Sequence, residues 1–531
     1  MKPGGSPRGE ERIGLTHGGE TMGGRSGSMM YGTVLLTFSG LFGQVVGFFY
    51  RIALARLIGP ETMGLYQLIM PVYSVISSIT TVGLTVAVST LSAKYQARGD
   101  RLGICRVRRS CLTCLVVLLL PVAAVTVAFS DPISVYILGD ARTRTGLILL
   151  LPCILLTGIE NVQKHCFFGM GLVRPPAFSE MAEQIIRAVA VLGLLVLCLP
   201  LGGEGTVGVI VVGMVVCEVF SAATLTILFR RRVGSCGCCC PRPQSLYREI
   251  GRIALPVGST ALLGNLMGSA NAILIPQLLV KGGKTAGEAM SDFGVINGMT
   301  IPMLLMPTAF IGALGLVLVP KLAQAVALDQ RKEAREGLGR VMAATSCVLL
   351  PCMALLVVIG PSLGRLLFKD PRAGEMILPL AIGVIFTGYQ AVLGSALNGL
   401  GKQSAAAGNM LLSDGVQLAF TYFLVGDPRI GLKGYVTGLW VSSLLGAWLN
   451  WRSVRKTIAL KGQTFSWAVA PGLGALLMAL CCRLLFGYLG DAGLNAAVSC
   501  LITAAFGAVL YLVALQAQGI RSSDLMGGKE M

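Results

Sequence analysis

Two arginines inside a long apolar segment are the first candidates for chemistry in this sequence. Arg51 lies within the apolar segment 31–57, and Arg56 lies nearer the end of that segment. An arginine near the middle of a membrane costs roughly 2.5–3.5 kcal/mol, and a position facing lipid offers no compensation. Because no acidic residue lies within one helical turn of Arg51, we expect Arg51 to face a polar cavity or a protein partner. Arg56 could either contribute to the cavity or extend its guanidinium to the lipid headgroups.

Small residues precede Arg51 at a regular spacing. Ser39, Gly43, Gly47 and Arg51 are four residues apart, so they form one stripe along a helix. Small side chains in such a stripe let a second helix approach closely. This stripe therefore predicts a helix contact that leads toward Arg51.

A second group of charges falls in the segments 146–168 and 177–199. One helical face of the later segment carries Glu180, Glu183, Gln184 and Arg187, and the earlier segment carries Glu160 and Lys164 four residues apart. Ionisable groups within a membrane are functional candidates by default, and we assign Glu183 and Arg187 to substrate binding. The alternative is that these charges neutralise one another and only join helices.

The second half of the chain supplies mostly amides. Its apolar segments carry Asn265, Asn271, Asn297, Asn398, Asn409, Asp414 and Gln417. We assign Asn265 and Asn297 to substrate binding, and Asp414 with Asn409 to the binding of a coupling ion, either Na⁺ or a proton. A purely structural, hydrogen-bonded role for Asp414 is the alternative.

Composition places the chain in a membrane. Of its 531 residues, 54% are hydrophobic and 13% are charged, against about 25% charged in soluble domains. The sequence holds 2 histidines and no phosphate-binding loop or nucleophile motif, so we expect no enzyme activity, no cofactor and no metal. The 16 cysteines follow no disulfide pattern. The run Cys236–Cys240 could bind a soft metal, but reduced thiols are the simpler interpretation.

Hydropathy predicts an all-α membrane protein with fourteen transmembrane helices. With the N-terminus inside, the predicted inner segments hold 29 Lys and Arg residues and the outer segments hold 9. This bias predicts that both termini are cytoplasmic. It also accounts for the formal net charge of +18 without a nucleic-acid partner.

Residues recur at an offset of 230. Asp140 matches Asp370, Gly64 matches Gly294, Thr157-Gly158 matches Thr387-Gly388, and Gly169 and Gly171 match Gly399 and Gly401. Six spans form each copy, so the copies enter the membrane with the same orientation, which is typical of transporters that alternate access. The predicted units are a disordered tail (1–28), a first lobe (29–232), a cytoplasmic linker (233–252), a second lobe (253–461), a two-helix hairpin (462–518) and a C-terminal tail (519–531).

Three stretches carry a resemblance to a known family. The runs GFFYRIALARLIG at 47–59, GLYQLIMPVYS at 64–74 and TVGLTVAVSTL at 81–91 resemble the stage V sporulation protein B branch of the multidrug/oligosaccharidyl-lipid/polysaccharide flippases. The resemblance implies a V-shaped pair of lobes, related by a pseudo-two-fold axis, around a cavity that opens to either side in turn. It also implies that a first-span arginine, Arg51 or Arg56, faces this cavity. The family's sodium site uses acids in spans 7 and 11, but span 7 here offers only Asn265 and Asn271, so Asp414 is the one acid that carries over.

The resemblance implies a polyprenyl-pyrophosphate-linked saccharide, such as the peptidoglycan precursor lipid II, as the cargo. Pyrophosphate transfer across hydrocarbon requires cationic and hydrogen-bonding groups, which the residues above supply. We therefore expect a monomeric flippase of the cytoplasmic membrane that serves cell-wall, spore-cortex or polysaccharide synthesis, driven by Na⁺, protons or the membrane potential. Its partners would be the lipid-linked substrate, membrane lipids and wall-synthesis enzymes. A cation-coupled multidrug exporter of the same fold and a non-transporting scaffold remain the alternatives.

Overall fold

The computed structural model describes residues 22–198, 202–234, 244–308, 311–312, 318–319, 322–325, 328, 330–458 and 466–519. Every regular element in these ranges is a helix, which confirms the all-α prediction. The first half contains α1 (Met22–Ser77), η1 (Ser78–Val82), α2 (Gly83–Ala97), α3 (Arg101–Ala128), α4 (Ser130–Pro132), η2 (Ile133–Leu138), η3 (Ala141–Thr143), α5 (Arg144–Gly169), α6 (Arg174–Cys198) and α7 (Gly203–Val233).

The second half repeats a helical bundle and adds a hairpin. It contains α8 (Gln244–Lys281), α9 (Ala286–Phe293), η4 (Gly294–Thr300), α10 (Ile301–Leu305), α12 (Arg331–Phe368), α13 (Pro371–Glu375), α14 (Ile377–Gly399), α15 (Gln403–Leu424), α16 (Leu432–Ile458), α17 (Ser466–Asp491) and α18 (Ala496–Ala517). The elements η1, η2 and η4 are π-helical, a conformation that frequently occurs at functional sites.

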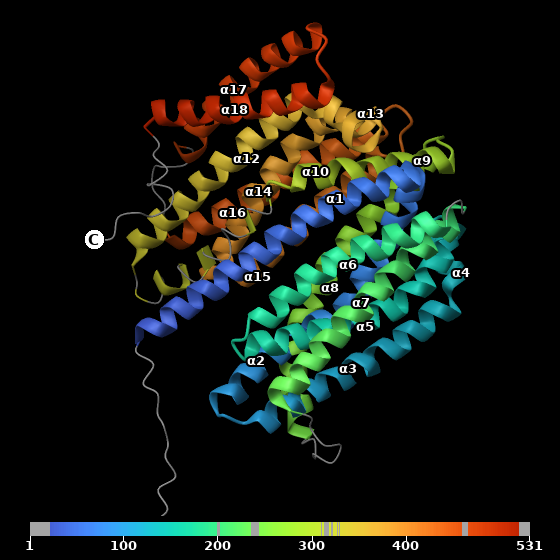
Figure 1. The fold of residues 1–531 in the computed structure, drawn as a ribbon, viewed down its shortest axis with the longest axis vertical. Helices are drawn as coiled ribbons and strands as arrows, with labels where there is room; N and C mark the ends of the chain where they lie inside the picture. Colours follow the sequence, from blue (N-terminus) through green and yellow to red (C-terminus); the bar gives the residue numbers. More distant parts are fainter. Residues whose placement is uncertain are drawn as a thin grey trace, which may run out of the picture.

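A sharp bend divides α1 into two antiparallel arms. Gly59 has a φ of 73° inside the element, and Pro60 follows it. Glycine adopts this left-handed conformation without steric cost, and proline fits the first turn of the next helix. The chain therefore runs up the first arm and returns toward α2 (Figure 1), as the predicted turn at Gly59-Pro60 requires. We call this extremity of the molecule the Gly59 end.

The number of spans stays a prediction. Among the described residues, 10 helical stretches are long and apolar enough to cross a membrane, and one of them, 34–97, contains both arms of α1. Helices α15 and α16 are 22 and 27 residues long, but their polar residues make them too hydrophilic to belong to this set. Part of the predicted span 293–319 lies outside the described residues.

Two predicted boundaries differ from the structure. The helix α1 begins at Met22, so the predicted disordered tail 1–28 is too long. The helix α8 begins at Gln244, within the predicted linker 233–252, because polar residues continue the helix beyond the apolar run. Lys94 Nζ lies 2.5 Å from Glu249 Oε1 in that extension, which ties α8 to α2. The cysteine run Cys236–Cys240 lies outside the described residues.

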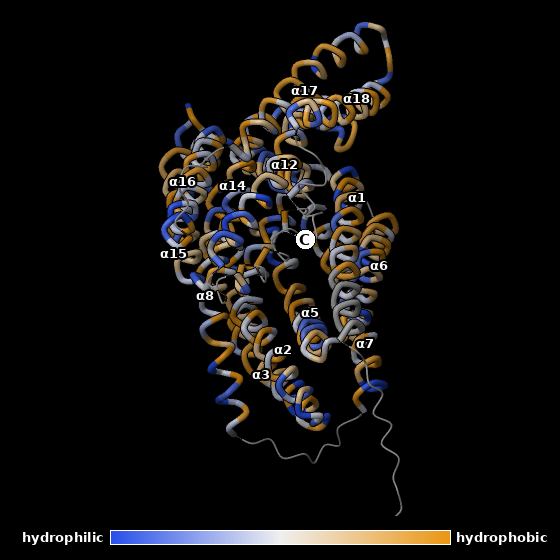
Figure 2. The backbone as a smooth tube through the Cα atoms, turned by 90° about the vertical axis from the view of Figure 1, so that its left-hand side faces the viewer, coloured by the Kyte–Doolittle hydropathy of each residue, from blue (hydrophilic) through white to orange (hydrophobic). Residues whose placement is uncertain are grey.

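Each half of the molecule has its own core of buried apolar side chains. In the first half, α3, α5 and α7 pack around residues such as Leu115, Phe167 and Phe229. In the second half, the core joins α12, α14 and α16. The hairpin α17–α18 packs on the outside of α12 through Met478 and Tyr511 (Figures 1 and 2), where the sequence places an appended hairpin.

The repeat at an offset of 230 is visible in the hydrogen bonds. Asp140 Oδ1 accepts from the backbone N–H of Arg142 at 2.9 Å, and Asp370 Oδ1 accepts from that of Arg372 at 2.9 Å. The preceding residues, Gly139 and Lys369, both have positive φ values of 79° and 58°. Burial opposes ionisation of Asp370, but the guanidinium and the backbone N–H of Arg372 outweigh it and lower the pKa of this carboxyl.

Candidate functional site

The first arm of α1 lies between the two halves of the molecule (Figure 1). Ile52 and Ala55 belong to the buried core of the second half. Leu54 and Tyr50 pack instead with α6 and α7 of the first half. Because these two faces are about 100° apart or more on the helix, one helix contributes to both cores. Any movement of the two halves relative to each other must therefore change the contacts of this arm.

Arg51 points between the halves, away from the apolar outer face. The exposed apolar side chains of the arm include Val45, Phe49 and Leu57. With 100° per residue, Arg51 lies on the side of the helix opposite to these positions, between the faces of Leu54 and Ala55. Its side chain is partly buried and makes no hydrogen bond or ion pair with the described part of the chain. This placement supports the predicted role in anion binding.

Arg56 has protein partners instead of a place at a cavity. Its Nε donates to the carbonyl oxygen of Leu367 at 2.6 Å, and its Nη2 donates to that of Leu366. Both carbonyls are at the C-terminal end of α12, where helices leave carbonyl groups without intrahelical partners. Arg56 thus caps a helix of the second half from a helix of the first. The structure places it in a contact between the halves, not among the residues that line a cavity.

Adjoining cavities run along α8. A cavity of about 680 Å³ between α8 and α15 is lined by Thr260, Asn265 and Asp414, among others. A second, of about 620 Å³, shares Thr260 and Asp414 and extends to α14 and α16. A third, of about 280 Å³, shares Asn265 and reaches α1 and η4. Amide and hydroxyl side chains form most of the polar lining, so this space can hold the polar part of a substrate. No arginine lines these three cavities.

The predicted amides Asn265 and Asn297 both line the third cavity. Asn265 Nδ2 also donates to Ser78 Oγ of η1 at 2.6 Å, which joins the two halves. Asn297 Nδ2 is buried and has no hydrogen-bond partner within the described residues. An unpaired buried amide is costly, so Asn297 has a donor available for a substrate or a water molecule.

Asp414 and Asn409 do not form one site. Asp414 borders the two larger cavities and makes no hydrogen bond or ion pair with any described residue. Asn409 lies five residues earlier, about 140° away around the helix. Its amide donates to Asn450 Oδ1 at 3.0 Å and to Ser453 Oγ at 3.2 Å. Asn409 therefore joins α15 to α16, and Asp414 is the carboxylate that faces open space.

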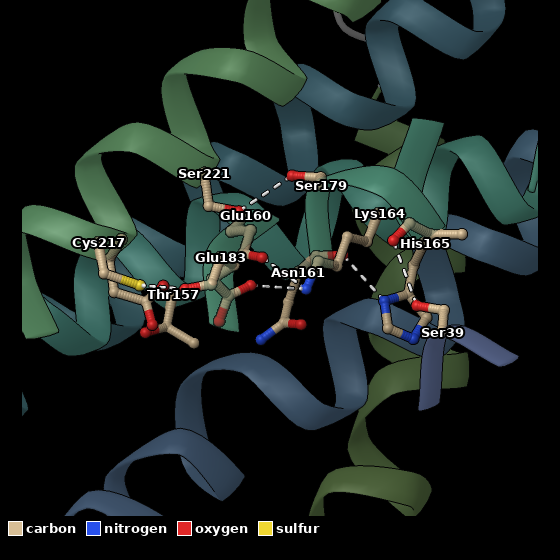
Figure 3. Close-up of polar contacts among 12 residues, drawn as sticks. Ser39, Thr157, Glu160, Asn161, Lys164, His165, Ser179, Glu183, Cys217 and Ser221 are labelled. Carbon is tan, nitrogen blue, oxygen red and sulfur yellow. Dashed lines mark hydrogen bonds and ion pairs between the residues drawn. The ribbon is translucent and has the colours of Figure 1, made fainter. Parts of the chain in front are cut away.

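Glu183 and Arg187 belong to a buried ionic cluster within the first half. Figure 3 shows Glu160, Lys164 and Glu183 of this cluster. Arg187 Nη2 bonds Glu183 Oε1, and Lys164 Nζ lies 3.1 Å from Glu183 Oε2. Arg187 and Arg51 are both close to the phenol groups of Tyr50 and Tyr66. The cluster thus adjoins Arg51, but Glu183 faces cations of its own lobe and is not free to bind a substrate.

Glu218 is a candidate site residue that sequence reasoning missed. It lies on α7, its side chain is 3% exposed, and its Oε1 lies 3.4 Å from Arg187 Nη2. The signal was available, because an acid in the apolar run VIVVGMVVCEVFS at 209–221 needs a partner. What could not be read from the sequence is that this partner is Arg187, 31 residues away.

A helical bundle of two repeated halves, with apolar outer faces and polar cavities inside, is the architecture of a multi-pass membrane protein. The chain matches the family described as "Polysaccharide biosynthesis protein" over residues 29–326, and it belongs to that family, within the multidrug/oligosaccharidyl-lipid/polysaccharide flippase superfamily.

Relatives agree with this assignment. The chain is 25% identical over 475 residues to "Stage V sporulation protein B" of Bacillus subtilis (strain 168), covering 87% of this chain and 90% of that protein. It is 21% identical over 430 residues to "Lipid II flippase MurJ" of the same organism, covering 75% and 78%.

Solved structures show the same fold. A structure of "Lipid II flippase MurJ, inward closed conformation" superimposes with a TM-score of 0.71 at 12% identity, covering 92% of this chain and all of that one. An inward-facing multidrug resistance MATE family transporter gives a TM-score of 0.62 at 16% identity, covering 81% of this chain and 100% of that one.

Proposed function

We propose that this protein is a flippase that moves a polyprenyl-pyrophosphate-linked saccharide, such as a cell-wall precursor, across the cytoplasmic membrane by alternating access. The observation that carries the proposal is the placement of Arg51. Arg51 lies on the side of its helix opposite the exposed apolar face, between residues that pack in the first half and residues that pack in the second, and its guanidinium is always charged. A pyrophosphate is the ligand that such a group binds best, because the guanidinium fork pairs with two phosphate oxygens.

The cavities support the same class of substrate. They place Asn265, Asn297 and Asp414 along α8, where sugar hydroxyls would find hydrogen-bond partners. The polyprenyl chain can remain in the bilayer while the headgroup enters between the halves. Relatives named for stage V sporulation and for lipid II flipping favour a role in peptidoglycan or spore-cortex synthesis.

Transport by alternating access requires that contacts between the halves break and re-form. The Arg56 contact with α12 joins the halves near the Gly59 end, and the Asn265 contact with Ser78 joins them along α8. By the predicted topology, with both termini in the cytoplasm, the Gly59 end is external. The described conformation would then be closed to the outside at Arg56.

A flipping assay with purified protein tests the proposal. Vesicles containing the protein are loaded with a fluorescent polyprenyl-pyrophosphate-linked saccharide, and the fraction that becomes accessible to an impermeant quencher is followed. Protein-dependent flipping supports the proposal, and Arg51→Ala should remove it. Efflux of a cationic drug without flipping would favour the multidrug exporter, for which the cavity-facing carboxylate of Asp414 is the favourable observation. Absence of both activities would favour the scaffold.

A further inference from the structure

The buried ionic cluster of the first half is a chain of alternating charges. Lys164 Nζ lies 2.5 Å from Glu160 Oε1 and 3.1 Å from Glu183 Oε2. Arg187 Nη2 bonds Glu183 Oε1 and lies 3.4 Å from Glu218 Oε1. Each cation is therefore shared by two carboxyl groups, and Glu183 is in the middle of the chain. Helices α5, α6 and α7 each contribute at least one carboxyl group to the cluster.

The cluster has more acids than bases. It contains three carboxyl groups and two cationic side chains, so it would carry one net negative charge if every group were ionised. The three carboxyl side chains are 2%, 6% and 3% exposed for Glu160, Glu183 and Glu218. Burying an uncompensated charge costs free energy, and a buried site lowers that cost when it binds a counter-charge.

Two buried carboxyl oxygens of the cluster, Glu218 Oε2 and Glu160 Oε1, have no hydrogen-bond partner within the described residues. Glu160 Oε1 forms its ion pair with Lys164 at an angle that makes no hydrogen bond. The carboxyl group of Glu160 also lies within hydrogen-bonding reach of those of Glu183 and Glu218. Both oxygens of Glu183 are already paired with Lys164 and Arg187, so Glu218 is the neighbour with an oxygen left for a proton. Two buried carboxyl groups within hydrogen-bonding reach of each other favour sharing one proton, because their repulsion opposes the ionisation of both.

The remaining groups around this pair do not remove the imbalance. From α1, the phenols of Tyr50, Tyr66 and Tyr73 face Arg187 or Glu218. Helix α5 adds Cys153 and helix α7 adds Cys217, whose sulfur lies within 4.8 Å of carboxylate oxygens of Glu183 and Glu218. Phenols and thiols are neutral at ordinary pH. Arg51 acts on Tyr50 and Tyr66, and Glu180, one turn before Glu183, acts on Lys164; neither forms an ion pair with the cluster.

We propose that Glu160 and Glu218 form a proton-binding site inside the first half, distinct from Asp414 in the second half. One proton bridges the two carboxyl groups, and its loss leaves the cluster with a net negative charge. A proton suits the site better than a metal cation, because cations such as Na⁺ or Ca²⁺ need several oxygen ligands. Lys164 and Arg187 already occupy most of the oxygens here.

The site is connected to the transport path through Arg187. This side chain is 25% exposed, bonds Glu183 and Glu218, and approaches the same tyrosines as Arg51. Loss of the proton would leave an additional negative charge beside Arg187. Glu218 would then attract the Arg187 guanidinium more strongly, and the electrostatic potential next to Arg51 would become less positive. Proton binding would therefore favour binding of an anionic headgroup; this consequence, unlike the site itself, depends on the proposed flippase function.

Infrared difference spectroscopy of the purified full-length protein tests the site without any lipid substrate. The carbonyl band of a protonated carboxylic acid is recorded as the pH is raised, for the wild type and for Glu218→Gln, Glu160→Gln and Glu204→Gln. We expect a pH-dependent band equivalent to one proton per chain in the wild type. Glu218→Gln and Glu160→Gln should each remove it. Glu204, at the exposed start of α7, provides the matched control, and Glu204→Gln should leave the band unchanged.

Three results would overturn the assignment. One is a wild-type spectrum without a titrating carboxylic-acid band. Another is a band that persists in both Glu218→Gln and Glu160→Gln. A third is a band that disappears on addition of NaCl at constant pH, which would identify a cation site. Because glutamine has nearly the same shape as glutamate, elution as a single monodisperse peak checks that each variant is folded. A failure of vesicle flipping would leave these spectra unaffected.

Discussion

Gly64 and Gly294 pack against each other across the interface between the two halves. A Cβ atom added to Gly64 would lie 2.1 Å from the carbonyl oxygen of Met290, and one added to Gly294 would lie 2.0 Å from that of Pro60. Both pairs, Gly64 with Gly294 and Pro60 with Met290, are separated by 230 residues in the sequence. The contact is therefore reciprocal, as a two-fold relationship between the repeats requires. The pseudo-two-fold axis passes close to this pair, near the Gly59 end.

Closure at the Gly59 end depends on these glycines. Gly294→Ala places a methyl group against a backbone carbonyl that cannot rotate away, and such overpacking costs about 1–3 kcal/mol. We expect the variant to populate conformations in which the halves separate at this end. The measurement is the distance between spin labels at the exposed positions Tyr136 and Arg429, one in each half.

The matched control for Gly294→Ala is Gly40→Ala, because a Cβ at Gly40 meets no atom within 4 Å. Gly40→Ala should leave the distance distribution unchanged. An identical distribution in Gly294→Ala and the wild type would show that the halves do not separate at this contact.

Arg56 should stabilise the same closed conformation. Arg56→Ala removes two hydrogen bonds to the last carbonyls of α12, with an expected loss of about 1 kcal/mol because the side chain is partly exposed to solvent. The spin-label distance should again shift to longer values. Arg56→Lys keeps the charge but cannot donate two hydrogen bonds from a rigid fork, so an intermediate shift is expected. If Arg56→Ala blocks flipping without any change in distance, Arg56 binds substrate and does not close the halves.

Asp370 should make stability depend on pH. The pKa of its carboxyl is lower in the folded protein, so its contribution is present above the unfolded pKa of about 3.9 and is lost as the pH falls through the folded value. Asp370→Asn keeps a capping side chain, because asparagine caps a helix about as well as aspartate, but it loses the ion pair with Arg372, at a cost of up to about 1 kcal/mol. Thermal unfolding should show this loss at neutral pH and a smaller difference under acid conditions. Asp491→Asn, at an exposed position, is the control and should show no loss at either pH.

The sequence predicts contacts between residues that are close together in the chain better than contacts between residues that are far apart. Asp140 and Asp370 could be paired from the sequence, because each caps its own helix over two residues. The turn at Gly59-Pro60 is equally local. The partners of Arg56 lie more than 300 residues away, and no spacing rule reaches that far. Glu160 and Lys164 were recognisable as a pair, but their link to Glu218 exists only after α5, α6 and α7 pack together.

Asp414 should affect ion dependence more than substrate binding. Its carboxylate borders two cavities, and Asp414→Asn keeps the shape while removing the charge that would hold Na⁺ or a proton. Flipping rates in vesicles are compared with and without a Na⁺ gradient and a pH gradient, together with substrate affinity. Asp427→Asn, at a position just beyond the end of α15, is the control. If the Asn variant responds to both gradients as the wild type does, Asp414 has no part in coupling.

Arg51 should be required for flipping and not for folding. Arg51→Ala removes a cation that the described structure leaves without an ion-pair partner, and loss of a charge makes its helix easier to insert into the membrane. Hydrogen bonds to charged groups are worth about 1.5–3 kcal/mol, so flipping should fall by at least about tenfold at normal membrane abundance. Arg51→Lys should recover part of the rate, because an ammonium keeps the charge but lacks the bidentate fork.

Abundance in the membrane separates this role from a structural one. If Arg51 joined two helices, Arg51→Ala would lower the amount of folded protein, whereas a binding role predicts unchanged abundance with lost flipping. Arg98→Ala, at an exposed position beyond α2, should match the wild type in both measurements. Normal abundance together with full flipping by Arg51→Ala would exclude both roles, and the anion would then have to be bound by another cation near the cavities. Arg187 would be the next residue to test, because it approaches the same tyrosines.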